Sequence, residues 1–143
     1  MNGISLEQAR NIIAASFSKA SDAGLQPLSV VVLDAGGHTT AFERQDGASA
    51  MRFKIAHGKA YGAIAMGLGS RALYERAQSQ AYFIDAMNEL ADGALVPVPG
   101  GVLIRDDAGV LLGAVGVTGD NSNNDEMCAT AGIEAAGLVA DTG

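Results

Sequence analysis

Two segments of this chain share one arrangement: an apolar run rich in β-branched residues, an Asp-Ala-Gly turn, and a second run. They cover residues 28–47, where the turn begins at Asp34, and residues 100–119, where it begins at Asp107. Asp and Gly readily adopt the backbone conformations that tight antiparallel connections need. The sequence therefore predicts two β-hairpins, separated by a long stretch with a mostly helical pattern.

Helical patterns fill much of the remaining sequence. Residues 5–8 have the form of a capping box, and apolar residues follow at helical spacing up to Gly24. Residues 51–68 are apolar or small on every face, which predicts a helix packed on several sides. One or two short helices are expected within residues 70–92, and Asn123 is expected to cap a last helix. This order predicts an α+β domain, with an antiparallel sheet and helices against its faces.

Composition limits the classes of function. The chain has 143 residues, of which 48% are hydrophobic, so one domain over residues 1–143 is expected. The net charge of −7 and only nine Lys and Arg leave no basic stripe, which disfavours nucleic acid and anionic membranes as partners. No leader pattern and no apolar stretch of about 18 residues is present, so the cytoplasm is the expected compartment. The single cysteine, Cys128, excludes an internal disulfide and is expected to be a buried hydrophobe.

Two basic residues are candidates for ligand contacts. Arg44 lies where the first hairpin ends, and it is expected to form an ion pair with Asp46, to receive a ligand carboxylate through its planar fork, or to do both. Lys59 lies in the most apolar helical stretch, so its ammonium either reaches out to water or points into a polar cavity. Burial would lower the pKa of Lys59 and make it a base or an anion partner.

The histidines and one acidic pair are candidates for chemistry. His38 lies in the first hairpin turn and is expected to be solvated. His57 cannot make a multidentate zinc site, but one neutral nitrogen suffices for an axial ligand to haem iron; the alternative is a surface or hydrogen-bonded core histidine. Asp125 and Glu126 either complement the dipole of the last helix or act as acid, base or metal ligands.

Familiar catalytic motifs are absent from the sequence: it has no P-loop, no G-x-S-x-G elbow and no H-E-x-x-H pair. Gly113, Gly116 and Gly119 are spaced by three along a predicted strand, whose side chains alternate between faces. These glycines therefore indicate close packing, or a backbone that faces a ligand near residues 116–119.

Several strings together resemble the GlcG/HbpS family, also called the haem-degrading domain family, which includes the C-terminal domain of PduO-type proteins. They are Val32-Leu-Asp-Ala-Gly-Gly37, Phe42-Glu-Arg-Gln-Asp-Gly-Ala48, Ala56-His-Gly-Lys-Ala-Tyr61, Pro99-Gly-Gly-Val102, Gly113-Ala-Val-Gly-Val-Thr-Gly119 and Asp125-Glu126, and the match runs from about Ser5 to Gly137. The resemblance implies a profilin-like fold, in which helices flank a five-stranded antiparallel sheet. It also implies dimers or higher oligomers with pockets at subunit contacts.

The resemblance extends to ligands and to site residues. Some members of the family bind haem or cobalamin-related ligands, and many are encoded in catabolic operons without a settled activity. The family pattern marks these positions: Arg44, Asp46, Gly47, Lys59, Pro99, Gly100, Gly101, Gly116, Gly119, Asp125 and Glu126. Members differ in their axial ligand, so the pattern does not identify His57 or Thr118 as the axial ligand. Both residues remain candidate ligand contacts.

Two main hypotheses follow. In the first, the chain is an oligomeric binding protein whose intersubunit pocket takes an anionic, largely apolar ligand such as haem, with Arg44 and Lys59 meeting its carboxylates and His57 as a candidate iron ligand. In the second, it is a small hydrolase or isomerase acting on a carboxylated metabolite. Arg44 would then clamp the carboxylate, Lys59 or Glu126 would act as general base, and the backbone of residues 116–119 would stabilise an oxyanion. A structural oligomer without a ligand is the third possibility.

Overall fold

The computed structural model describes residues 3–143, which contain five helices and five strands. In chain order these are α1 (Leu6–Asp22), β1 (Ser29–Asp34), β2 (Thr39–Arg44), α2 (Arg52–Met66), α3 (Ser70–Ser79), α4 (Ala81–Leu90), β3 (Gly101–Arg105), β4 (Leu111–Thr118), α5 (Ser122–Ala135) and β5 (Val139–Asp141). The strands form one antiparallel sheet in the order β2-β1-β4-β3-β5. This confirms the predicted α+β, profilin-like fold.

Both predicted hairpins are present, and aspartates organise their turns. Asp34 Oδ1 accepts hydrogen bonds from the backbone N–H groups of Gly36 and His38. His38 is solvated as predicted, with 81% of its side chain exposed. In the second turn the corresponding acceptor is Asp106, whose Oδ1 accepts from two backbone N–H groups, and not the neighbouring Asp107 of the predicted turn. Pairing of β1 with β4 then joins the two hairpins into one sheet.

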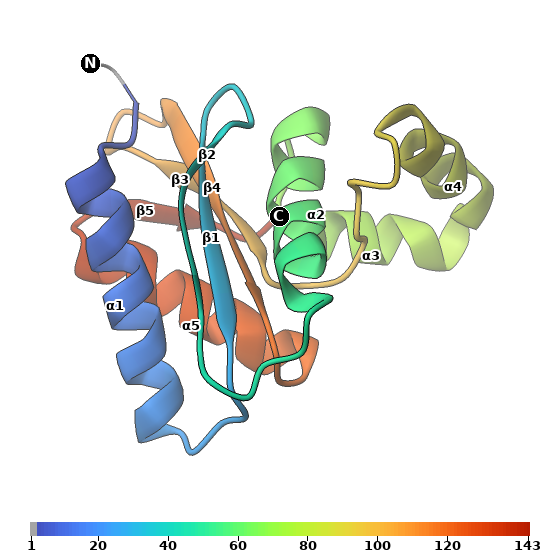
Figure 1. The fold of residues 1–143 in the computed structure, drawn as a ribbon. Coiled ribbons are helices and arrows are strands. Elements are labelled where there is room, and N and C mark those ends of the chain that lie inside the picture. The colour runs from blue at the N-terminus through green and yellow to red at the C-terminus, as the bar shows by residue number, and fades with distance from the viewer. Residues whose placement is uncertain (1–2) are drawn as a thin grey trace.

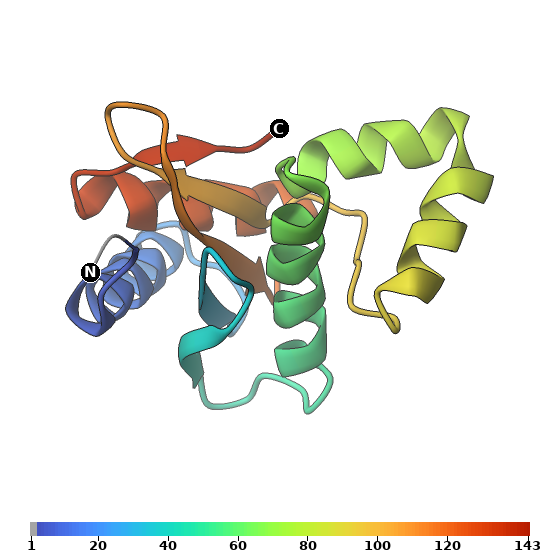
Figure 2. The ribbon, with the colours of Figure 1, turned by 90° about the horizontal axis from the view of Figure 1, so that it is seen from above.

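Alternate residues of β1 belong to different cores, because side chains of a strand point to opposite faces. Val30 and Val32 lie in the apolar cluster that includes α1 and α5, whereas Val31 and Leu33 lie in the cluster that includes α2. Burying such a side chain completely contributes about 1.5–3 kcal/mol. The sheet therefore separates two helical layers, with α1 and α5 on one face and α2 on the other (Figure 1 and Figure 2).

Small residues allow the helices to approach other backbone closely. A Cβ on Gly116 of β4 would collide with the carbonyl oxygen of Ala56 in α2. On the other face, a Cβ on Gly132 of α5 would collide with Ser16 Oγ of α1. Close packing therefore explains the glycine at position 116, as one of the two sequence interpretations predicts.

The helices α3 and α4 project away from the sheet as an arm (Figure 1 and Figure 2). The uncertain stretch 70–92 is thus two helices, because Gln80 adopts a non-helical conformation, with φ −138° and ψ 55°. Leu73, Ile84 and Leu95 form a small core of their own beneath this arm.

Two features near the C-terminus differ from the prediction. Asn121, and not Asn123, caps α5, because its side chain accepts a hydrogen bond from the Asn124 N–H group. The residue pattern did not indicate β5, which is only three residues long; only the family resemblance implied a fifth strand.

Cys128 lies fully buried in α5, as predicted. Burial raises the pKa of its thiol to about 11, because a thiolate is poorly solvated there. Among residues 3–143, no helix combines the length and the apolar character that crossing a membrane requires.

We expect Gly116→Ala to lower the free energy of unfolding by about 1–3 kcal/mol, because the added methyl group must displace the backbone of α2. Urea denaturation measures this loss. Gly3→Ala is the matched control, since a Cβ there would lie 3.6 Å from its nearest neighbour, the Leu112 carbonyl oxygen. Equal stability of the two variants would contradict the close approach of α2 to β4.

Candidate functional site

Lys59 of α2 and Asp125 of α5 form a buried ion pair at one end of the sheet. Lys59 Nζ lies 3.1 Å from Asp125 Oδ2 and donates a second hydrogen bond of 2.9 Å to the Val117 carbonyl oxygen. The two side chains are only 2% and 1% exposed. Because α2 and α5 cover opposite faces of the sheet, this pair connects the two helical layers directly.

The Pro99-Gly100-Gly101 segment packs against Lys59. A Cβ on Gly100 would lie 2.9 Å from Lys59 Nζ and 2.6 Å from the Val117 carbonyl oxygen. Gly101 donates its N–H to Ser70 Oγ at 2.7 Å, and a Cβ there would collide with the Lys59 carbonyl oxygen. The fold thus brings the predicted residues Lys59, Gly100 and Gly101 together, while their contact with a ligand stays a prediction.

Burial shifts the pKa of both members of the pair. Removal from water lowers the pKa of Lys59 and raises the pKa of Asp125, since a surrounding of low dielectric disfavours either charge. Their mutual attraction opposes both shifts. Asp125 Oδ1 also accepts a hydrogen bond of 3.0 Å from the Asp120 N–H group. Each charged group is therefore engaged by protein partners, and neither lines the surface hollows described below.

Glu126 faces a different partner from its neighbour Asp125. Its Oε2 lies 3.0 Å from Arg71 Nε, and Arg71 Nη2 donates to Asn123 Oδ1 at 2.7 Å. Arg71 lines a polar hollow of about 240 Å³, together with Pro99 and residues 121–123 among others. These contacts attach the arm to the start of α5.

Catalytic roles for Glu126, Asp125 and Lys59 stay predictions.

Two arginines flank the loop between β2 and α2. Arg44 donates a hydrogen bond of 2.7 Å to the Ala48 carbonyl oxygen. Within residues 3–143 this contact takes the place of the ion pair with Asp46 that we considered. Arg52 donates a hydrogen bond of 3.0 Å to Thr118 Oγ1, which fixes the start of α2 to the end of β4.

A hollow of about 200 Å³ lies beside these contacts, and we call it the loop hollow. Its lining residues are Gln26, Pro27, Gly47, Ala48, Ser49, Arg52 and Gly119. Two predicted site residues, Gly47 and Gly119, thus meet at one place, although they are far apart in the sequence.

The outer side of α2 carries three ring side chains, Phe53, His57 and Tyr61, which we call the aromatic face. Successive rings are stacked, with centroids 5.8 Å apart between Phe53 and His57 and 5.6 Å apart between His57 and Tyr61. Phe42 of β2 meets Phe53 edge-on at 4.7 Å. Burial lowers the pKa of His57, because the less polar surroundings favour the neutral imidazole.

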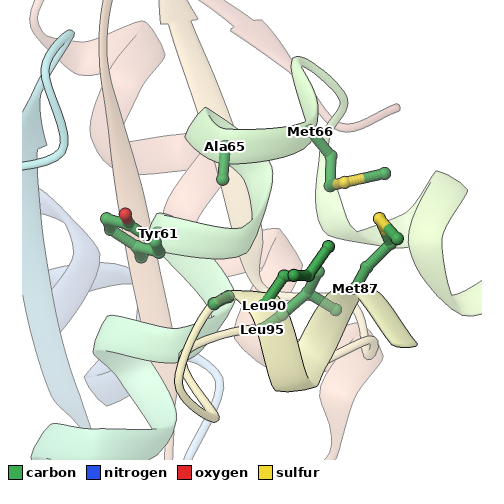
Figure 3. A pocket seen from close by; sticks show the side chains of 7 residues that line it. Tyr61, Ala65, Met66, Met87, Leu90 and Leu95 are labelled. Atoms are coloured by element: carbon green, nitrogen blue, oxygen red, sulfur yellow. The ribbon is translucent and has the colours of Figure 1, made fainter. Parts of the chain in front are cut away.

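Two hollows lie beside the aromatic face. One, of about 220 Å³, is lined by Phe53, Lys54, His57, Asp92, Gly93 and Ala94. The other, of about 230 Å³, lies between α2 and α4, and its lining residues are Tyr61, Ala65, Met66, Met87, Leu90, Ala91 and Leu95 (Figure 3). Each hollow is smaller than the roughly 300–1,000 Å³ of typical small-molecule pockets.

Comparison with known proteins identifies the family. The family model described as haem degrading protein HbpS-like matches residues 4–134. The chain belongs to the HbpS-like family. This confirms the resemblance that the sequence motifs indicated. The search of curated proteins finds no match.

Solved structures support the same assignment to the HbpS-like family. PduOC, solved in complex with haem, is 25% identical, with 95% of this chain and 96% of that chain covered and a TM-score of 0.84. A double mutant of HbpS from Streptomyces reticuli is 26% identical, with 94% and 87% covered and a TM-score of 0.78. The ORFY protein of Klebsiella pneumoniae is 23% identical, with 96% and 92% covered and a TM-score of 0.86, and supports the fold alone.

Sequence reasoning missed several residues that the structure brings together in this HbpS-like protein. Phe53 and Tyr61 lie four residues on either side of His57, and this helical spacing was a readable signal for the aromatic face. Arg52 and Arg71 gave no such signal, because their partners Thr118 and Glu126 lie 66 and 55 residues away in the chain.

We expect Lys59→Met to lower the free energy of unfolding by about 3–5 kcal/mol, because it leaves the Asp125 carboxylate buried without a counter-charge. The double variant Lys59→Met with Asp125→Leu should lose less free energy of unfolding than the two single variants lose together, since no unpaired charge remains. Urea denaturation of all three variants measures this coupling.

Arg71→Met is the control for this cycle. The ion pair of Arg71 with Glu126 is partly exposed, so removing this pair should lower the free energy of unfolding by only about 0–1 kcal/mol. Strictly additive losses in the Lys59 and Asp125 variants would show that the two charges do not act as a pair.

Proposed function

We propose that this protein is an oligomeric binding protein for haem or a related tetrapyrrole, which it holds against the aromatic face of α2. The match to the HbpS-like family model and the similarity to PduOC, which was solved with haem, support this ligand class. One observation carries the proposal. The His57 ring lies between two aromatic rings beside a hollow, and it makes no hydrogen bond within residues 3–143.

His57 has the chemistry that an axial ligand needs. Its lowered pKa keeps a neutral nitrogen available at pH 7. A haem iron requires only one or two protein ligands, whereas a bare ion requires several. Among residues 3–143, no group of three or more His, Cys, Asp or Glu could hold a bare ion. A bound haem would supply iron chemistry at this place, and His57 would supply a nitrogen ligand.

The surroundings of His57 suit a flat, apolar ring system with acidic substituents. Phe53 is 38% exposed and Leu90 is 78% exposed, so apolar surface is available on both α2 and α4. Lys54 lines the same hollow as His57 and offers a cation for a propionate group. In this proposal Lys54 takes the part first predicted for Lys59, whose ammonium already pairs with Asp125.

The size of the hollows supports a site shared between subunits. Neither the hollow at His57 nor the one between α2 and α4 reaches the usual volume of an enclosing pocket. A macrocycle resting on the aromatic face would therefore leave one side open to water. A second copy of the chain would cover that side, which accords with the intersubunit pockets that the family resemblance implies.

We expect stoichiometric haem to give a shifted Soret band with the wild-type protein. In His57→Ala, haem affinity should fall about tenfold or more, which corresponds to about 1.4 kcal/mol. Because protonation removes the ligating lone pair, wild-type affinity should also fall as the pH drops through the lowered pKa of His57, below 6.5. Absorbance titration at several pH values measures both effects.

His38→Ala is the matched control, because His38 is highly exposed in the first hairpin turn and should leave haem binding unchanged. An unshifted Soret band with wild-type protein would refute haem binding. Equal affinity in His57→Ala and the wild type would refute the assignment of the iron ligand.

A further inference from the structure

The loop hollow is formed where three distant chain segments converge. Residues 26–27, residues 47–49 and Gly119 meet there, beside Arg52 of α2. Gly119 permits this convergence, because its φ is 143° and a Cβ would collide with the Pro27 carbonyl oxygen. Gly47, with φ of 86°, permits the turn that follows β2.

Arg52 brings a positive charge to this hollow without a carboxylate partner. Its guanidinium carries five N–H donors, and the described contacts use one of them, for Thr118 Oγ1. Two other arginines of this chain, Arg71 and Arg105, each lie within 3.0 Å of a carboxylate oxygen. Arg52 also lies close enough to Lys59 to repel its charge, and the Asp125 carboxylate already pairs with Lys59.

Asp46 and Asp120, which neighbour the lining residues Gly47 and Gly119 in sequence, form no ion pair with Arg52 among residues 3–143. The Asp120 carboxylate accepts hydrogen bonds from Gln26 N, Asn121 N and Asn124 Nδ2. Asp46 is exposed, and within residues 3–143 it forms no ion pair. The Arg52 guanidinium therefore keeps N–H donors that no carboxylate among residues 3–143 engages, although the Asp120 carboxylate lies 3.0 Å from the N–H group of the lining residue Gln26.

We propose that the loop hollow binds a small oxyanion, a carboxylate or phosphoryl group, with Arg52 as its main donor. The planar guanidinium can donate two parallel hydrogen bonds to such a group. The Ser49 side chain is exposed at the rim, makes no hydrogen bond within residues 3–143, and adds a hydroxyl donor. Arg44 positions the loop by its bond to the Ala48 carbonyl oxygen. A volume of about 200 Å³ admits a small anion or the terminal group of a larger ligand.

This site is distinct from the aromatic face. Arg52 and Phe53 are successive residues of α2, so their side chains leave the helix about 100° apart. Arg52 contacts Thr118 of the central sheet, whereas Phe53 stacks on His57 at the outer side. Oxyanion binding can therefore be measured without haem and does not depend on the function proposed above.

The test is thermal unfolding of the purified protein in inorganic phosphate and in acetate, each compared with potassium chloride of equal ionic strength. We expect a saturable rise in Tm with at least one of the two anions. Arg52→Gln should lower the affinity for that anion about tenfold or more, which is the loss expected when a charged hydrogen-bond donor is removed. Arg10→Gln changes the net charge equally on an exposed side of α1 and should retain the full effect.

Ser49→Asp tests the site without removing the bond that Arg52 makes to Thr118. The new carboxylate should pair with the Arg52 guanidinium and abolish the anion effect. Ser49 is exposed and lies in the loop between β2 and α2, so the substitution removes no buried contact. An effect of acetate alone would identify carboxylates as the natural class, and an effect of phosphate alone would identify phosphoryl groups. His57→Ala should leave the rise in Tm unchanged. No saturable rise with either anion, or an equal rise in Arg52→Gln or Ser49→Asp, would overturn the proposal.

Discussion

The buried ion pair of Lys59 with Asp125 fixes how the two helical layers are placed on the sheet. Taking each charge out of water costs several kcal/mol, so the pair is stable only where both partners and their hydrogen bonds are held in place. The Val117 carbonyl oxygen and the Asp120 N–H group provide those bonds. The end of β4, the start of α5 and the middle of α2 must therefore keep one arrangement, and Gly100 leaves the space for it.

Helix α2 uses its inner and outer sides for different purposes. Its inner side packs on the sheet through small residues such as Ala56 and Ala60, which meet Gly116 of β4. Its outer side carries the aromatic face, with His57 in the middle. Its first residue, Arg52, faces the loop hollow. Since both proposed sites lie on a helix that the ion pair and the sheet hold firmly, their side chains are preorganised for binding.

The arm of α3 and α4 is held less firmly than the three layers. It is secured by a small core of Leu73, Ile84 and Leu95 and by the partly exposed pair of Arg71 with Glu126. Fewer buried apolar contacts favour local opening. The hollow between α2 and α4 lies at this joint, so a ligand or a second copy bound there would order the arm, at a cost in conformational entropy that its contacts must offset.

The sequence by itself determined the two hairpins, the long helices and the family, but not β5 or the division of residues 70–92 into two helices. The two Asp-Ala-Gly turns, the capping box and the helical spacing predicted both hairpins, α1 and α2, because these signals are local. Family motifs marked Lys59 and Asp125 as candidate site residues but did not predict that they pair. The pairing of Lys59 with Asp125, the contact of Arg52 with Thr118 and the loop hollow were decided only by the tertiary structure. Each joins residues far apart in the chain, and only the packing of helices on both faces of the sheet brings them within hydrogen-bond distance.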